Sequence, residues 1–478
     1  MVEMDREQKK KWHKIGVICA EFIMVASVVA IVVITTLIAM GWNVNRDGEI
    51  EQTGLLQLHT MPAGATVEID GETMFARTDM SRSLSPGHHY IKASREGYDT
   101  WEKDIEMDSG RLMRVYYPRL FAQNRKVEQM ADLGAELEFY SAAPNHKYLL
   151  WAKKDAAQWQ WADVSGDRID VKTVDVSELF DLTNGVFNGE IIDMKWSDSG
   201  EKVLTKVKNN DVIRWYLLNL REIAKSQDLT ADFGLDFAAV KIMDSAADKL
   251  WTLENGNLRL VNAASRESSR ILVSGVEQVN AKGGVVAYVR TVGEQHWMGV
   301  YREGEQGVVD LYEVGADAAQ VWLSKYYNED YLAVVQGQKM TIYKGMLPSY
   351  NTDEKVKVEE YLTTFAEKEL KFKPEQLAGG PGDEYVGAWS GTRVAMLDLE
   401  RADLYDYEVG ADARWLDDSM LYRVTDGVLT VWDFDGTNKR ELASNAAADD
   451  VVISSNNKYL YYIQAGESLK LVREQIII

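Results

Sequence analysis

The sequence predicts one N-terminal transmembrane helix followed by an all-β ectodomain, in which a small β-sandwich precedes a seven- or eight-bladed β-propeller. Three observations predict this class: a long uncharged segment near the N-terminus, alternating apolar and polar residues after it, and a strand–turn–strand phrase that recurs from Val127 onward. The predicted boundaries, in chain order, are a cytoplasmic stub at 1–14, a transmembrane helix at 15–42, a linker at 43–53, the sandwich at 54–121 and the propeller at 122–478.

The uncharged segment from Phe22 to Met40 has nineteen residues. As a helix it would measure about 28 Å, enough to cross the hydrocarbon core of a bilayer. Five basic residues precede it: Arg6, Lys9, Lys10, Lys11 and Lys14. Because basic residues favour the cytoplasmic side, we expect a single-pass protein of the cell membrane with a cytoplasmic N-terminus and an extracytoplasmic bulk.

Two alternatives for this segment fit less well. It is longer than the core of a cleaved signal peptide, and no clear small-residue cleavage site follows it. A lipoprotein signal ending at Cys19 would need a small residue where Ile18 stands. Glu21 lies about one turn inside the cytoplasmic end, where contact with the interface is favoured over an intramembrane functional role.

The chain is strongly acidic beyond the membrane segment. Its net charge is −22, and the part after residue 40 holds 48 basic and 71 acidic side chains, a charge of −23. Phosphate backbones would be repelled by such a body, so we expect no nucleic-acid partner. The single cysteine, Cys19, gives no information on the redox compartment.

The segment after the linker alternates apolar and polar residues, as at 56–60 and 66–71, which predicts half-buried strands. Asp70-Gly71 and Pro86-Gly87 supply tight-turn signals between such strands. We therefore expect a compact antiparallel unit. His88 and His89 are adjacent in a predicted strand and point to opposite faces, so they are not expected to share a metal ion.

The residues of this unit resemble the PEGA domain, a small β-sandwich of surface proteins. The motif runs in order through Thr60, Pro62, Gly64-Ala65, Val67, Ile69-Asp70-Gly71, Ser85-Pro86-Gly87 and Gly97-Tyr98. The match covers about 54–120 and departs at Ala63, where Glu is usual, and at 76–79, where the family has a Gly-x-Thr-Pro turn. The resemblance implies a surface or envelope adaptor without catalytic residues.

The recurring phrase predicts the propeller. Clear copies lie at 139–151, 194–204 and 452–462, and weaker ones begin near Val240, Val276, Val321, Leu377 and Ala413. The spacing of roughly 35 to 55 residues is typical of four-stranded propeller blades. The last copy lacks an outer strand, which 126–133 would supply and so close the ring.

The segment 428–442 resembles the repeat of TolB-type propellers, in which a strand ends in an Asp-Gly turn with a following Asn. Asp433 and Asp435 there fit Asx turns better than calcium ligands, because no further ligands follow. The charged stretch 352–373 interrupts the repeats, and the spacing of Val358, Leu362 and Phe365 predicts a helix that packs on a blade or binds a partner.

No catalytic, cofactor-binding or metal-ligating residue is assigned, since no Gly-x-Ser-x-Gly, phosphate-binding loop or zinc motif occurs. Trp159 and Trp161 would share one strand face, where they could stack on a sugar. Most other tryptophans fall within predicted strands and are assigned to the core: Trp196, Trp251, Trp322 and Trp415.

These observations favour a membrane-anchored envelope protein whose propeller is not an enzyme and binds or scaffolds an envelope protein or polysaccharide. It would need no cofactor, and its helix would contact the lipid bilayer. Two alternatives stay open: an extracytoplasmic glycan hydrolase or lyase with carboxylates near the propeller axis, and a passive structural spacer.

Overall fold

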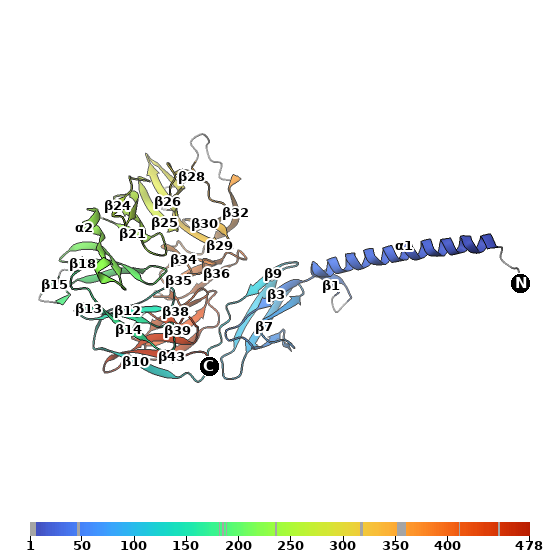
Figure 1. Cartoon of the computed structure of the whole chain (residues 1–478), viewed down its shortest axis with the longest axis horizontal. Helices are drawn as coiled ribbons and strands as arrows, with labels where there is room; N and C mark the ends of the chain where they lie inside the picture. The colour runs from blue at the N-terminus through green and yellow to red at the C-terminus, as the bar shows by residue number, and fades with distance from the viewer. Residues whose placement is uncertain are drawn as a thin grey trace. The chain divides into compact units, whose positions relative to one another are not determined.

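The computed structural model describes residues 6–44, 48–180, 182–183, 186–187, 189–234, 237–315, 319–350, 360–410, 412–447 and 450–478. The chain divides into two compact units, 1–124 and 125–478 (Figure 1).

The first unit begins with α1 (Arg6–Ala39), which starts within the predicted stub. The most apolar 18-residue window of its stretch Lys11–Ile38 has a mean hydropathy of 2.9, and none of that window is buried. Among the described residues it is the one helix long and apolar enough to cross a membrane. A short antiparallel pair follows the helix: β1 (Trp42–Val44), which begins at the last residue of the predicted transmembrane segment, and β2 (Ile50–Gln52), within the predicted linker.

Two sheets form the sandwich of this unit. One has the order β5-β4-β7-β8 and the other β6-β3-β9. Their bounds are β3 (Gly54–Leu58), β4 (Thr66–Ile69), β5 (Glu72–Thr73), β6 (Met80–Leu84), β7 (Gly87–Ser94), β8 (Trp101–Met107) and β9 (Leu112–Val115). The core between them includes the fully buried Leu56, Val67, Ile91 and Trp101. The expectation of a wholly antiparallel unit is wrong, because β3 pairs with β9 in parallel.

The predicted Asp70-Gly71 turn is confirmed. Both residues have positive φ, 53° and 80°, and Ile69 pairs directly with Glu72, as in a two-residue hairpin. The Asp70 carboxylate accepts the Tyr90 amide at 2.9 Å and lies 2.6 Å from His89 Nδ1. Burial alone would raise the pKa of Asp70, but these hydrogen bonds outweigh it and lower that pKa.

The second unit is a β-propeller built from four-stranded antiparallel sheets, of which eight lie in its described part. The first sheet holds β11 (Leu137–Ala142), β12 (Tyr148–Lys153), β13 (Gln158–Asp163) and β14 (Asp170–Asp175). The second holds β17 (Glu190–Trp196), β18 (Lys202–Asn209), β19 (Val212–Asn219) and β20 (Gln227–Asp228). The third holds β21 (Ala239–Ile242), β22 (Lys249–Glu254), β23 (Asn257–Asn262) and β24 (Glu267–Ser268). The fourth holds β25 (Val276–Lys282), β26 (Val285–Val292), β27 (Gln295–Arg302) and β28 (Val309–Val314).

The later sheets continue this pattern. The fifth holds β29 (Gln320–Tyr326), β30 (Glu329–Gln336), β31 (Lys339–Gly345) and β32 (Leu362–Glu369). The sixth holds β33 (Gln376–Gly379), β34 (Tyr385–Ser390), β35 (Arg393–Asp398) and β36 (Leu404–Glu408). The seventh holds β37 (Arg414–Trp415), β38 (Met420–Thr425), β39 (Val428–Asp433) and β40 (Arg440–Ala443). Short elements lie between the sheets: β15 (Leu182–Thr183), β16 (Val186–Phe187) and α2 (Leu229–Phe233). Within the second sheet, η1 (Ile223–Lys225) connects β19 to β20.

The eighth sheet joins the two ends of the unit. It combines β41 (Val452–Ile453), β42 (Tyr459–Gln464) and β43 (Leu469–Gln475) with β10 (Val127–Gly134), in the order β10-β43-β42-β41. Figure 1 shows the sheets following one another from green to red, with β10 beside β43. This is the closure expected from the sequence, and it leaves β43 without a free edge.

The first strands of neighbouring sheets contact each other, as β25 does with β29 and β29 with β33, so these strands line the inside of the ring. The side chain of Asn280 on β25 accepts the Leu323 amide of β29 at 2.9 Å, which fixes one such contact.

The predicted helix at 352–373 is wrong where the structure describes it. Residues 351–359, including Val358, lie outside the described part, and 362–369 form β32, paired with β31. Leu362 and Ala366 are buried, whereas Phe365 falls at a register shift opposite Ile342 and Tyr343. This bulge places apolar residues at a spacing that imitates a helix.

Candidate functional site: a lysine-lined hollow inside the propeller

In four of the eight described sheets, one turn geometry recurs before the strand that holds Tyr148, Lys202, Tyr385 or Tyr459. The amide of its first residue donates to the carbonyl five residues later, at 2.8 to 3.0 Å. The donor–acceptor pairs are Ala143–Tyr148, Ser197–Lys202, Gly380–Tyr385 and Ser454–Tyr459. The residue three positions into each turn has a positive φ: His146, Gly200, Asp383 and Asn457. The phrase found in the sequence is therefore a turn with fixed hydrogen bonds, which holds the preceding strand in register.

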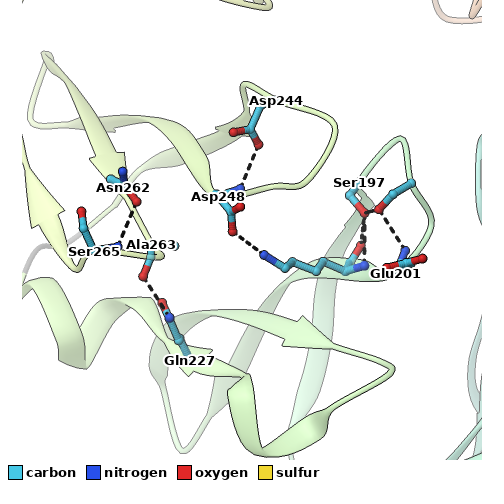
Figure 2. Close-up of polar contacts among 10 residues, drawn as sticks. Ser197, Glu201, Gln227, Asp244, Asp248, Asn262, Ala263 and Ser265 are labelled. Carbon is cyan, nitrogen blue, oxygen red and sulfur yellow. Dashed lines mark hydrogen bonds and ion pairs between the residues drawn. The ribbon is translucent and has the colours of Figure 1, made fainter.

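Figure 2 shows how these turns are tied together in the second and third sheets. Ser197 Oγ donates to the Lys202 carbonyl at 3.0 Å and accepts its amide at 3.1 Å. The Lys202 ammonium then reaches Asp248 Oδ1 in the third sheet at 2.5 Å. Asp244 accepts the Asp248 amide at 2.8 Å, which closes the turn of the third sheet. These bonds fix the ends of β17 and β21, which precede the two turns, relative to each other.

A hollow of about 830 Å³ lies beside these turns. Its lining comes from the ends of β17, β21, β25 and β29, the first strands of the second to fifth sheets, and from neighbouring turns. Four lysines come from equivalent places: Lys195, Lys241 and Lys325 are each the second-last residue of their strand, and Lys282 is the last. Arg302 adds a fifth cation at the end of β27.

Lys241 is half-buried. Its ammonium donates to the Val279 carbonyl at 3.4 Å. Burial, and then the nearby charge of Lys195, lower the pKa of Lys241 to about 8. Lys195 itself pairs with Asp193 at 2.8 Å and lies 5.6 Å from the centre of the Trp215 ring.

Lys282 makes a connection across sheets. Its ammonium lies 2.5 Å from a carboxylate oxygen of Asp383, in the first turn of the sixth sheet, past the fifth. Lys325 is exposed on β29. Neither Lys241 nor Lys325 has a carboxylate within 4 Å in the part of the chain that the structure describes.

Four carboxylates also line the hollow, and three of them are engaged: Glu303 with Lys249 at 2.6 Å, Asp244 with the Asp248 amide, and Asp330 with the Leu347 amide at 3.5 Å. The fourth is Asp198. Ser324 is 3% exposed and lines the hollow, and its hydroxyl has no hydrogen-bond partner among the described residues.

A separate group of acids lies in the sixth sheet. Burial, and then the charge of Asp398, raise the pKa of Glu384 to about 8, and Tyr385 donates to its carboxylate at 3.0 Å. Burial likewise raises the pKa of Asp398 to about 6, although two backbone amides oppose the shift. Neither residue lines the hollow.

The tryptophans considered for sugar stacking are buried. Trp159 is 0% and Trp161 is 5% exposed, and the Trp159 ring packs against Phe139, Phe180 and Phe187. They belong to the core with Trp196 and Trp251, which the sequence assigned there correctly. Trp322 and Trp415 are half-buried.

The structure also places the residues that the sequence offered as calcium, metal or intramembrane sites. Asp435 accepts the Thr437 amide at 3.0 Å, and Asp433 accepts the Asn438 side-chain amide at 2.9 Å, so both take part in the predicted turn. His88 is exposed, whereas the His89 ring bonds to Asp70 and Ser85. Glu21 lies exposed on α1. Among the described residues, no group of three or more His, Cys, Asp or Glu is placed to hold a metal.

Sequence reasoning missed the lysines of the hollow, although a signal existed. Lys195 stands two residues before the Ser197 turn, in a clear copy of the phrase. Aligning the weaker copies on their turns would have placed Lys241, Lys282 and Lys325 in nearly the same position.

Comparisons with known proteins give the following similarities. No curated protein matches the chain. Among solved structures, PorZ, a surface component of the type-IX secretion system of Porphyromonas gingivalis, matches with 10% identity and a TM-score of 0.39, over 71% of this chain and 43% of its own. The Dos1 propeller matches with 10% identity and a TM-score of 0.42, over 73% and 94%. An oligogalacturonate lyase in complex with manganese matches with 10% identity and a TM-score of 0.35, over 59% and 88%. Residues 53–119 match the PEGA domain family, which confirms the resemblance found in the sequence.

Proposed function

We propose that this chain is a membrane-anchored binding module of the cell envelope, whose propeller holds an envelope protein or polysaccharide in its hollow. The helix α1 anchors it, with the N-terminus in the cytoplasm and both β units outside. The basic residues that precede the apolar stretch support this orientation. The observation that carries the binding role is the hollow itself, because charged and polar side chains from four successive sheets converge on it.

Blocking the hollow tests this role. Gly284 lines the hollow without a positive φ, and a Cβ there would meet Glu303 and Met243 at ordinary contact distances of 3.5 and 3.6 Å. Gly284→Trp therefore fills the space between lining residues. Gly166 is exposed and has only distant neighbours, so Gly166→Trp is the matched control.

The assay is retention of protein and polysaccharide fractions of the native envelope by the full chain in lipid nanodiscs. We expect the unchanged chain and Gly166→Trp to retain a component that Gly284→Trp does not. Equal retention by all three proteins would overturn binding in the hollow. Retention of nothing by the unchanged chain would favour a passive spacer.

The orientation has its own test. With Cys19→Ser as background, a cysteine replaces either Tyr327, which is 61% exposed in the propeller, or Lys11 in α1. A membrane-impermeant maleimide should label the Tyr327→Cys protein in intact cells and the Lys11→Cys protein only after lysis. The reverse pattern would contradict an extracytoplasmic propeller.

A glycan hydrolase or lyase is the second candidate. It is favoured by the four carboxylates that reach the hollow from the turns and strands of four sheets, since glycosidases use such pairs. Asp330→Asn would then abolish turnover of the retained polysaccharide. A binding module predicts no shortening of that polysaccharide by the unchanged chain over a long incubation.

A further inference from the structure

The hollow presents hydrogen-bond donors in excess of free acceptors. The lysine ammonium groups can only donate, and the buried Ser324 hydroxyl has no partner among the described residues. Three of the four lining carboxylates are occupied by a lysine or by backbone amides. A ligand that fits this arrangement must bring acceptor atoms.

The lysines of the hollow also differ in whether a carboxylate pairs with them. Lys195 has its own partner in Asp193, and Lys282 has Asp383, but Lys241 and Lys325 lack a carboxylate partner among the described residues. Holding the half-buried Lys241 ammonium without a counter-ion is costly, and a negatively charged ligand group would remove that cost. These lysines contrast with the chain beyond residue 40 as a whole, which is acidic, with a charge of −23.

We propose that the ligand of the hollow is an anionic polymer of the envelope, whose oxyanion groups accept hydrogen bonds from Lys241, Lys325 and Ser324. The inference rests on the proposed function and gives its ligand a chemical class. Carboxylates and phosphates share this chemistry, since a lysine ammonium binds either as a point charge. The row of equivalent lysines on successive strands suits a chain with charges repeated along its length.

The Asp383 carboxylate competes with such a ligand. It holds Lys282 at 2.5 Å, and its side chain is only 18% exposed. Removing this carboxylate frees Lys282 for the ligand, so Asp383→Asn strengthens binding. Asparagine tolerates the φ of 63° at this position, so the turn is retained. The proposal thus predicts one variant that weakens binding and one that strengthens it.

The test measures binding of three probes to the full chain in nanodiscs at low salt: an alginate hexasaccharide, a polyphosphate of similar charge, and neutral cellohexaose. We expect at least one anionic probe to bind and cellohexaose not to bind. Lys325→Gln should weaken binding about 3- to 5-fold, the effect of losing one exposed charge pair. Asp383→Asn should strengthen it by a similar factor. Lys147 is an exposed lysine in the turn between β11 and β12 and does not line the hollow, so Lys147→Gln should leave binding of the probes unchanged.

Binding of alginate alone supports a carboxylate polymer, binding of polyphosphate alone supports a phosphate polymer, and binding of both supports recognition by charge. In each case, added salt should weaken binding of the anionic probe. The inference is overturned if an envelope component is retained while neither anion binds, or if Lys325→Gln and Asp383→Asn leave anion binding unchanged. Either result would overturn the anionic ligand but leave the proposed binding role standing. If the unchanged chain retained no envelope component, the proposed binding role itself would be overturned.

Discussion

Replacing Glu474 by alanine removes the carboxylate that connects the two ends of the propeller. Glu474 lies on β43, and its side chain is 4% exposed. Arg125, at the start of the second unit, donates to it through Nε at 2.5 Å and to the Leu442 carbonyl at 2.7 Å. The buried Tyr462 hydroxyl donates to the other carboxylate oxygen at 3.1 Å. The substitution leaves a guanidinium that is 17% exposed without this partner.

Breaking one side of a buried ion pair costs about 3 to 5 kcal/mol, because the remaining charge stays desolvated. We therefore expect Glu474→Ala to lower the free energy of unfolding of the propeller by about 4 kcal/mol. Glu474→Gln should cost less, since its carbonyl oxygen can still accept one of these hydrogen bonds.

The measurement is urea unfolding of the full chain in detergent, followed by tryptophan fluorescence. The midpoint should fall while the slope stays constant, since the same surface is exposed on unfolding. Glu136→Ala is the control, because Glu136 also bonds a cation, Lys154, at 2.6 Å but both side chains are more than half exposed. It should cost no more than about 1 kcal/mol. Equal midpoints for Glu474→Ala and Glu136→Ala would refute a structural role for the buried closure.

Three further predictions follow from burial and charge. Burial raises the pKa of Glu384 from 4.5 to about 8, so the folded state gains stability that is complete below about pH 4.5 and lost as the pH rises through about 8. Glu384→Gln should remove this slope and stabilise the propeller at pH 9, by at most about 5 kcal/mol; an unchanged pH profile would contradict the shifted pKa. Trp101→Ala should destabilise the sandwich by about 3 to 5 kcal/mol in thermal unfolding, since the ring is fully buried, whereas a cost below 1 kcal/mol would show that the core collapses around the gap. Millimolar calcium should leave the melting temperature unchanged, because Asp433 and Asp435 are bound within their turn, and a rise of several degrees would instead identify a calcium site.

The parts of the fold that local physics determines could be predicted from the sequence. The alternation of apolar and polar residues predicted the sandwich strands, and Asp70-Gly71 predicted the turn between β4 and β5. The repeated phrase predicted the sheets because its turn depends on neighbouring residues, such as Ser197 and Gly200, and the same turn hydrogen bond recurs in four sheets. Closure by β10 followed from the missing outer strand of the last copy.

The parts that depend on distant residues could not be predicted. The parallel pairing of β3 with β9 joins segments more than fifty residues apart, and no local pattern encodes it. The bulge at Phe365 made a strand resemble a helix in its apolar spacing. The hollow depends on the packing of successive sheets side by side, which brings Lys195 and Lys325 from separate sheets to one space. A lysine at the end of a strand has no special meaning until its neighbours in the ring are known.

Lysine footprinting tests the central claim, that the hollow is where the propeller holds its ligand, most directly. Full chain in nanodiscs is acetylated at low reagent concentration with and without the retained envelope fraction, and modification is read by mass spectrometry at each lysine. The account predicts that Lys195, Lys282 and Lys325 lose reactivity when the fraction is bound. Lys147, and Lys92 on β7 of the sandwich, should keep theirs. Protection confined to lysines of the sandwich, or no protection in the hollow, would contradict it.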